Sequence, residues 1–117
     1  MVPIVYSIAE SKYEKHLVPL AVSIDEEVIG FCMYCKDPDD QRYWIYVFMI
    51  DEHQQGHGYG KAGLIKLLEL ISQKHSCNEI MIGHKSDNLK AEYLYKSVGF
   101  KNTGEVINDE IIKKYEF

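Results

Sequence analysis

A glycine-rich turn at residues 54–62 is the part of this sequence whose residue types and spacing could do chemistry. It reads Gln-Gln-Gly-His-Gly-Tyr-Gly-Lys-Ala. The glycines at 56, 58 and 60 let a backbone turn tightly and leave its N–H groups uncovered. A helix that begins here adds the positive end of its dipole, so turn and helix together favour a bound anion. The turn alone is compatible with any phosphate.

The elements on both sides place this turn in a β-α-β unit. Residues 43–50 read Tyr-Trp-Ile-Tyr-Val-Phe-Met-Ile, which predicts a central strand covered on both faces. From residue 58 to 75, apolar side chains recur at helical spacing, namely Leu64, Ile65, Leu67, Leu68 and Ile71. Residues 79–84 predict a short strand that lies parallel to the first.

The remaining segments predict two further helices and two hairpins. Residues 7–16 have helix-forming composition, with Ser7 as N-cap and Glu10 as its capping-box partner. Another helix is predicted to follow Asn88 and to end before Gly99. The hairpins are predicted at residues 20–24 with 28–34, and at residues 100–106 with 110–117.

Size, composition and charge limit the classes of function. The chain has 117 residues, 46% of them hydrophobic and 26% charged, and a net charge of −5. These values predict one globular domain over residues 1–117. We expect no membrane span and, because the start resembles no secretory leader, a cytoplasmic location. The negative charge argues against nucleic acid as a partner and is compatible with a small cationic substrate.

The sequence predicts no metal site. Cys32 and Cys35 form a C-x-x-C pattern, but on a strand two positions separated by three point to opposite faces. His53 and His57 lie on either side of a loop and belong to no metal-binding motif. Core or surface packing is therefore the expected role of the two cysteines.

Two motifs in this order resemble those of a known family. They are Gln55-x-x-Gly58-x-Gly60 after an apolar strand, and Asn88-x-x-Ala91-x-x-Leu94-Tyr95-x-x-x-Gly99-Phe100 further along. Together they are similar to the acetyl-CoA signature and the downstream asparagine and tyrosine motif of the GNAT superfamily of N-acetyltransferases. Residues 30–34, 37–40, 44–46 and 48–51 resemble its bacterial spermine/spermidine (diamine) N-acetyltransferase branch.

The resemblance implies the acyl-CoA N-acyltransferase fold, an α/β (mixed α+β) architecture with a central mixed sheet flanked by helices. Family members usually have a further strand and helix ahead of the segment that matches residues 7–16, and this chain is expected to lack them. Three explanations remain open: a naturally short member, a truncated product, or a subunit that covers the exposed sheet edge by forming a homodimer.

The resemblance also implies acetyl-CoA as co-substrate and assigns residues to it. The backbone of the strand before the turn would pair with the pantetheine arm, at Phe48, Met49 and Ile50. The N–H groups of the turn would hold the pyrophosphate, at Gly56, His57, Gly58, Tyr59, Gly60 and Lys61. Gln55 would flank this loop, and Asn88 and Ala91 would line the far side of the cofactor. Structural roles are the alternatives: the turn as a simple connection, and Asn88 as an N-cap.

Tyr95 is the catalytic residue that the resemblance implies. Its hydroxyl would lie near the thioester sulfur and protonate the leaving thiolate as general acid, and a core role is the alternative. Related diamine acetyltransferases carry a glutamate on the strand before the signature, where this chain has Tyr46. The sequence therefore does not identify the general base, and the candidates are Asp51, Glu52 and the aspartates near Asp37. The latter also have two interpretations, a solvated turn or a patch that attracts polyamines.

These inferences predict an acetyl-CoA-dependent N-acetyltransferase. The amine of a small, spermidine-like polyamine would attack the acetyl carbonyl directly in a ternary complex. Another amine, such as an amino acid, an aminoglycoside or a protein N-terminus, is one alternative. A truncated, weakly active acyl-CoA-binding protein is the other. A small-molecule amine is the expected partner in the leading hypothesis, with neither nucleic acid nor membrane.

Overall fold

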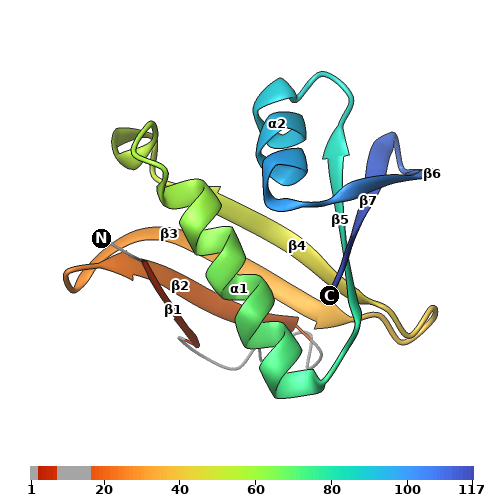
Figure 1. Ribbon diagram of the computed structural model, residues 1–117, viewed down its shortest axis with the longest axis horizontal. Helices are drawn as coiled ribbons and strands as arrows, with labels where there is room; N and C mark the ends of the chain where they lie inside the picture. The colour runs from red at the N-terminus through yellow and green to blue at the C-terminus, as the bar shows by residue number, and fades with distance from the viewer. Residues whose placement is uncertain (1–2, 8–16) are drawn as a thin grey trace.

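The protein folds around one mixed β-sheet. The structure is a computed structural model and describes residues 3–7 and 17–117. Its strand order is β1-β2-β3-β4-β5-β7-β6 (Figure 1). Along the chain the elements are β1 (Ile4–Ser7), β2 (Leu17–Ile24), β3 (Glu27–Lys36), β4 (Tyr43–Ile50), η1 (Glu52–Gln54), α1 (Tyr59–His75), β5 (Glu79–Lys85), α2 (Leu89–Val98), β6 (Lys101–Ile107) and β7 (Glu110–Glu116). Both predicted hairpins and the parallel pairing of β4 with β5 are confirmed.

Strand β1 at one edge of the sheet is an element that the sequence did not predict. It pairs antiparallel with β2, from Ile4 opposite Ser23 to Ser7 opposite Leu20. Ser7 is therefore the last residue of a strand, and its predicted role as an N-cap stays a prediction. The body of the helix predicted at residues 7–16 lies outside the described residues from residue 8 onward. Ahead of that segment the sheet thus has one strand more than expected.

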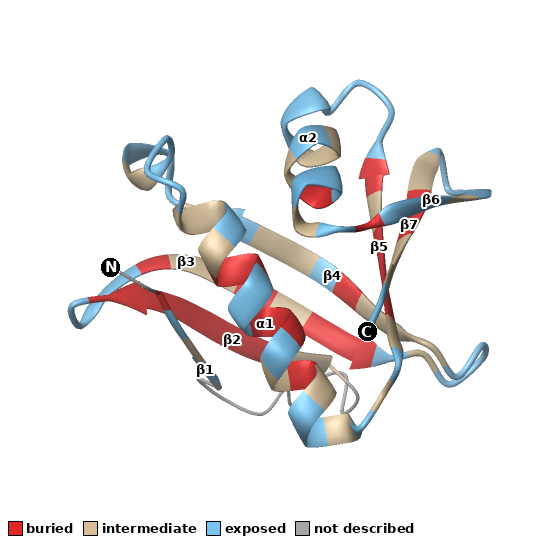
Figure 2. Cartoon of the chain, in the orientation of Figure 1, coloured by how far each residue is buried: buried red, intermediate tan, exposed pale blue. Residues whose placement is uncertain are grey.

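Helices α1 and α2 lie on the same face of the sheet (Figure 1). The predicted helical spacing is confirmed in α1, where Leu64, Leu67, Leu68 and Ile71 are at most 3% exposed. Figure 2 shows buried and exposed residues alternating along α1. Burying side chains of this size contributes about 1.5–3 kcal/mol each. Ile65 lies on the flank of the stripe and is 38% exposed. No helix in the described part of the chain is long and apolar enough to cross a membrane.

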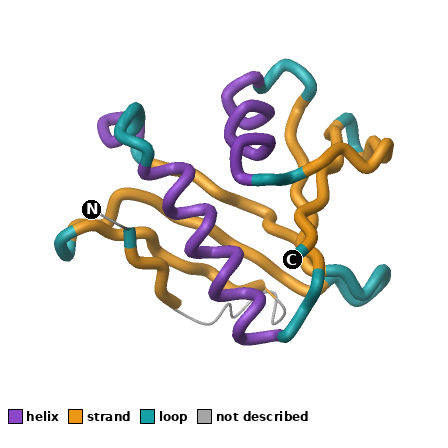
Figure 3. The backbone as a smooth tube through the Cα atoms, viewed as in Figure 1, coloured by secondary structure: helices purple, strands orange, loops and turns teal. Residues whose placement is uncertain are grey.

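A β-bulge in β4 changes the direction of that strand. Met33 of β3 pairs with Val47, whereas the next residue, Tyr34, pairs with Ile45, so Tyr46 is the inserted residue. A bulge bends its strand and increases the local twist. The pairing of β4 with β5 stops at the same place, because it joins only Trp44 to Met81 and Ile45 to Ile82. Beyond this point the two strands diverge (Figures 1 and 3).

The sequence-based interpretation of β4 as a strand covered on both faces is wrong. The strand is central in the sheet, as predicted. However, Tyr46 is 52% exposed and Met49 is 57% exposed, and only Ile45 is fully buried. The apolar run therefore does not mark burial from both sides. It includes side chains on the face away from the helices, next to the cavity described below.

Charged side chains fix α2 to the sheet. Between the helix and strands β5 and β7 lie His84 and Lys113, which are 4% and 0% exposed. The Glu92 carboxylate of α2 lies 2.9 Å from Lys113 Nζ and 2.8 Å from His84 Nε2. The histidine contact is an ion-pair distance without hydrogen-bond geometry. Asn102 accepts a hydrogen bond from Lys113 Nζ, and Lys96 adds an exposed ion pair to Glu92.

Replacing Glu92 with glutamine should lower the melting temperature at neutral pH, because Lys113 would stay buried without an anion. Hydrogen bonds from Lys113 and then Lys96 lower the pKa of Glu92 from 4.5 to about 2. A depressed carboxyl pKa stabilises the fold above pH 4.5, and this contribution is lost as the pH falls toward 2. The difference in melting temperature between wild type and variant should therefore shrink over that range.

Thermal unfolding followed by circular dichroism tests this expectation. Glu69→Gln is the matched control, because Glu69 forms an exposed pair with Lys66 at 3.5 Å. Exposed pairs contribute only about 0–1 kcal/mol, so this control should change the melting temperature little. Equal losses in the two variants at neutral pH would contradict the proposed anchoring by Glu92.

Candidate active site

The glycine turn follows β4 directly and forms an open backbone loop at the start of α1. Gly56 and Gly58 have φ angles of +86° and +78°, which few residues other than glycine adopt. A Cβ added to either would meet no atom within 4 Å. Gly58 is the N-cap of α1 and supplies no side chain to cap its first N–H groups. Those N–H groups are therefore available to an anion.

Gln55 ties this loop to the end of β4. Its side-chain Nε2 donates a hydrogen bond to the carbonyl oxygen of Ile50 at 2.9 Å. Just before it, the Asp51 side chain accepts a hydrogen bond from the His53 backbone N–H at 3.0 Å and caps η1. Asp51 thus has a local structural contact, and Gln55 joins the strand to the turn. His57 is exposed, with its ring 5.5 Å from that of Tyr59.

The end of β4 has different neighbours on its two sides. Its residues 47–50 pair with β3, where Phe48 lies opposite Cys32 and Met49 opposite Phe31. On the other side β5 has already diverged, so the pairing between the two strands does not extend to residues 48–50. The Phe48 ring packs beneath α1, 3.5 Å from where a Cβ on Gly63 would lie. On the side facing β5, no residue of that strand pairs with residues 48–50, although the Ile50 carbonyl oxygen accepts the Gln55 hydrogen bond.

Helix α2 contacts the start of α1 and carries Tyr95. The Leu94 side chain lies 3.8 Å from a Cβ built on Gly60. The Tyr95 ring lies between those of His84 and Phe100, with centroids 5.8 Å away in each case. Burial raises the pKa of the Tyr95 hydroxyl, and the nearby charge of Glu110 raises it further. The hydroxyl therefore keeps its proton at neutral pH, as a general acid must.

The N-terminus of α2 confirms the structural alternative for Asn88. Its Oδ1 accepts a hydrogen bond from the Ala91 backbone N–H at 3.1 Å, which is N-cap geometry. Asn88 is exposed and Ala91 is half-buried. Both stay predictions as cofactor-lining residues, since capping the helix and lining a cofactor do not exclude each other.

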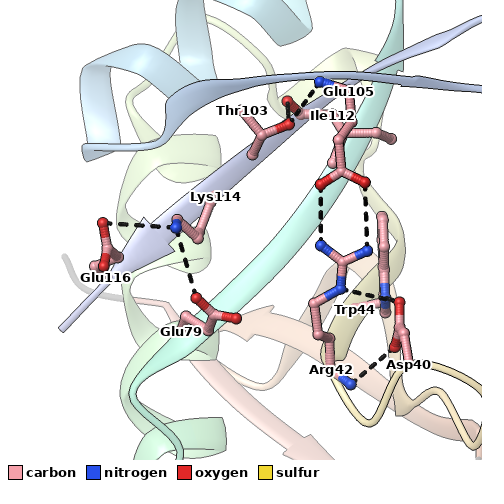
Figure 4. Close-up of polar contacts among 9 residues, drawn as sticks. All are labelled: Asp40, Arg42, Trp44, Glu79, Thr103, Glu105, Ile112, Lys114 and Glu116. Carbon is pink, nitrogen blue, oxygen red and sulfur yellow. Dashed lines mark hydrogen bonds and ion pairs between the residues drawn. The ribbon is translucent and has the colours of Figure 1, made fainter.

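A cavity of about 410 Å³ lies on the face of the sheet away from the helices. Its lining includes Asp37, Asp40, Trp44, Tyr46, Gly83 and Glu110. Asp40 accepts a hydrogen bond from the Trp44 ring at 3.1 Å and pairs with Arg42 at 3.0 Å. Arg42 also pairs with Glu105 of β6 at 3.1 Å (Figure 4). These ion pairs connect the β3–β4 turn to β6 along one side of the cavity.

The sequence anticipated this cavity only in part. Asp37 and Asp40, counted among its candidate bases, line it, whereas Asp51 and Glu52 are exposed beside the glycine turn. Glu110 was missed, because its place in the sequence gives no sign that it approaches β5. A glycine inside a predicted strand, Gly83, was a usable signal for such a close approach. In the described ranges, no three metal-binding side chains lie close enough to hold an ion.

Comparisons with known sequences agree with this geometry. The family model described as the acetyltransferase (GNAT) family matches residues 3–100. A spermine/spermidine N(1)-acetyltransferase of Bacillus subtilis (strain 168) is 31% identical over 94 residues. A probable spermine N(1)-acetyltransferase of Bacillus subtilis subsp. natto (strain BEST195) has the same identity over the same length. The matched region is 75% of this chain and only 62% of each relative.

Solved structures show the same fold at low sequence identity. The IAA acetyltransferase from Bacillus cereus ATCC 14579 matches with a TM-score of 0.79 and 15% identity, over 98% of this chain and 99% of its own. A GNAT family acetyltransferase from Elizabethkingia anophelis, with acetyl-CoA bound, gives 0.78 and 18%, over 98% of both chains. The PaiA N-acetyltransferase from Thermoplasma acidophilum, in complex with coenzyme A, gives 0.74 and 16%, over 87% and 62%.

Proposed function

This chain belongs to the acetyltransferase (GNAT) family, and on that premise we propose that it transfers an acetyl group from acetyl-CoA to a primary amine of a small polyamine. The observation that carries the proposal is the divergence of β4 from β5 after Ile45, with the glycine turn at the end of β4. The names of the two Bacillus relatives support the choice of a polyamine.

The cofactor fits the open backbone on the helix side of the sheet. The N–H groups of residues 56–61 would hold the pyrophosphate, because the glycines leave them uncovered and the dipole of α1 favours negative charge. The backbone of residues 48–50 would bind the pantetheine arm on the side that β5 leaves unpaired. Asn88 and Ala91, at the start of α2, would line the opposite side. Acetyl-CoA supplies the thioester that the amine attacks.

Tyr95 would act as the general acid. Its hydroxyl is buried and protonated, so it can give a proton to the sulfur as the carbon–sulfur bond breaks. A backbone N–H near Met49 would polarise the acetyl carbonyl oxygen. The amine would enter from the opposite face, where the cavity includes the carboxylates of Asp37, Asp40 and Glu110. Carboxylates around the entrance favour a cation with more than one amine.

Acetyl transfer is tested directly by incubating the protein with acetyl-CoA and measuring thiol release. Spermidine and spermine should give the highest kcat/KM in a panel that also contains amino acids and aminoglycosides. Higher turnover of another amine would support acetyltransferase activity but contradict a polyamine as the substrate. Coenzyme A binding by calorimetry with no turnover of any amine would instead favour an acyl-CoA-binding protein.

Gly58→Val should weaken coenzyme A binding about 10- to 100-fold, since hydrogen bonds to a charged group contribute about 1.5–3 kcal/mol. The β-branched side chain would sit in the open space of the loop and strain the left-handed backbone. Gly104→Val is the matched control. Gly104 also has a positive φ, +86°, and open space around its Cβ, but it lies in β6. Equal affinity losses in both variants, measured by calorimetry, would refute the phosphate cradle.

Tyr95→Phe should lower kcat about 10²-fold or more while coenzyme A affinity changes little, because only proton donation is removed. Tyr93→Phe is the control, since Tyr93 lies on the same helix and is 78% exposed. Steady-state kinetics and calorimetry on both variants separate the two effects. A Tyr95→Phe enzyme with wild-type kcat would leave the tyrosine only its packing role.

A further inference from the structure

We propose that Glu110 binds the attacking amine and removes its proton, as the general base of the reaction. The inference rests on the proposed acetyl transfer and gives its acceptor side a specific residue. Glu110 is the first residue of β7 and lines the cavity on the face away from the helices.

The Glu110 carboxylate lies against β5 at the point where β4 leaves. A Cβ built on Gly83 would be 2.6 Å from Glu110 Oε1, so the carboxylate occupies the space that a side chain would fill. Gly83 is the residue after Ile82, the last residue of β5 that pairs with β4. The carboxylate thus lies beside the start of the divergence, where an amine from the cavity would meet the donor side.

Glu110 and Tyr95 approach two neighbouring residues of β5, Gly83 and His84, from opposite faces of the strand. Side chains alternate between the two faces of a strand, so Gly83 and His84 face opposite ways. The His84 ring lies 5.8 Å from the Tyr95 ring on the helix side, while Glu110 covers Gly83 on the other. A reacting centre at the divergence of β4 and β5 would therefore have an acid on one side and a carboxylate on the other.

The carboxylate is available to an amine. Within residues 3–7 and 17–117, no side chain forms a hydrogen bond or an ion pair with it. The other acids of the cavity differ, because Asp40 binds Arg42 and Trp44, and Asp37 accepts the backbone N–H of Asp39 at 2.8 Å. Glu110 is also half-buried, which strengthens a charge-assisted hydrogen bond.

Five charged or titratable groups lie around Glu110 on the neighbouring elements. Tyr95 of α2 is coupled to it electrostatically, because the charge of Glu110 helps to raise the tyrosine pKa. Lys85 of β5 is its cross-strand partner and is exposed. Asp37, Asp40 and Tyr46 share the cavity. The surroundings are thus acidic on the cavity side, which favours an ammonium ion next to Glu110.

The proton and electron balance of the step is complete. Glu110 takes one proton from the ammonium and later releases it to water. The neutral amine attacks the acetyl carbon, the carbon–nitrogen bond forms, and the carbon–sulfur bond breaks. The sulfur takes the proton of the Tyr95 hydroxyl, and the second nitrogen proton returns to the tyrosine oxygen. The products are the N-acetylated amine, coenzyme A and one proton.

Glu110→Gln tests the proposal through the pH dependence of kcat/KM for spermidine. Without a base the enzyme must capture the small neutral fraction of the amine, whose pKa is about 10. The variant should therefore lose about 10²-fold or more at neutral pH and recover steadily as the pH rises toward that value. Coenzyme A affinity and melting temperature should stay at wild-type values, because the substitution keeps the shape of the side chain.

Two further variants separate catalysis from structure and from general charge. Asp109→Asn removes a negative charge from the adjacent turn position, which does not line the cavity, and asparagine tolerates its positive φ of 64°. It should keep the wild-type pH profile. Gly83→Ala should push the Glu110 carboxylate from its position, since the added Cβ would lie 2.6 Å from Oε1. It should lower kcat/KM for spermidine without changing coenzyme A affinity.

The outcomes distinguish this inference from the acetyl transfer on which it rests. Wild-type turnover together with an unchanged Glu110→Gln profile would overturn the role of Glu110 alone. A loss of equal size at every pH would also overturn it, because that pattern indicates a structural defect. If the wild-type protein turns over no amine, the proposed function fails and the inference fails with it. A loss at neutral pH that closes as the pH rises supports the assignment.

Discussion

The inserted residue in β4 is the constraint on which the rest of the structure depends. A regular β4 would continue to pair with β5, and the sheet would be closed at the proposed meeting point of acetyl donor and amine. The bulge at Tyr46 instead coincides with the end of that pairing at Ile45, and it bends β4 away. The strand then delivers its end to Gly58 at the start of α1. One extra residue thereby accounts for both the opening in the sheet and the direction in which β4 enters the glycine turn.

The divergence gives the two faces of the sheet different roles. On the helix face lie the uncovered N–H groups at the start of α1 and the Tyr95 ring beside His84. On the other face, β7 and the β3–β4 turn surround a cavity with carboxylates. An anionic cofactor and a cationic amine would therefore approach from opposite sides, each toward charge or dipoles of opposite sign. This separation keeps Asp40 and Glu110 away from the glycine turn, where negative charge would oppose binding of the proposed pyrophosphate.

Local pattern explains what the sequence could predict. Residues 64–71 show their helical spacing within a few positions, and the glycines of the turn are adjacent to the helix that they begin. The bulge could not be predicted from local pattern, because it depends on how β3 and β4 align. Tyr46 favours a β-strand as strongly as its neighbours do, so nothing marks it as the inserted residue. Glu110 was missed for the same reason, since its contact with Gly83 joins segments that are far apart in the chain. β1 was missed because four residues give too short a pattern.

The position of Tyr95 depends on charged contacts more than on apolar burial. Within α2, Tyr95 is the only residue that is fully buried, so a hydrophobic face alone would fix the rotation of this helix weakly. Glu92 lies three residues earlier, on the same side of the helix. Its ion pair with Lys113 and its 2.8 Å contact with His84 Nε2 require one orientation of α2, and the same orientation places the Tyr95 ring beside His84. Buried ion pairs add little net stability in general, but they penalise any arrangement that separates the charges. The buried Glu92–Lys113 pair beneath α2 therefore acts as a positional restraint on Tyr95, the proposed acid, which lies on the helix side of β5 while Glu110 lies on the other side.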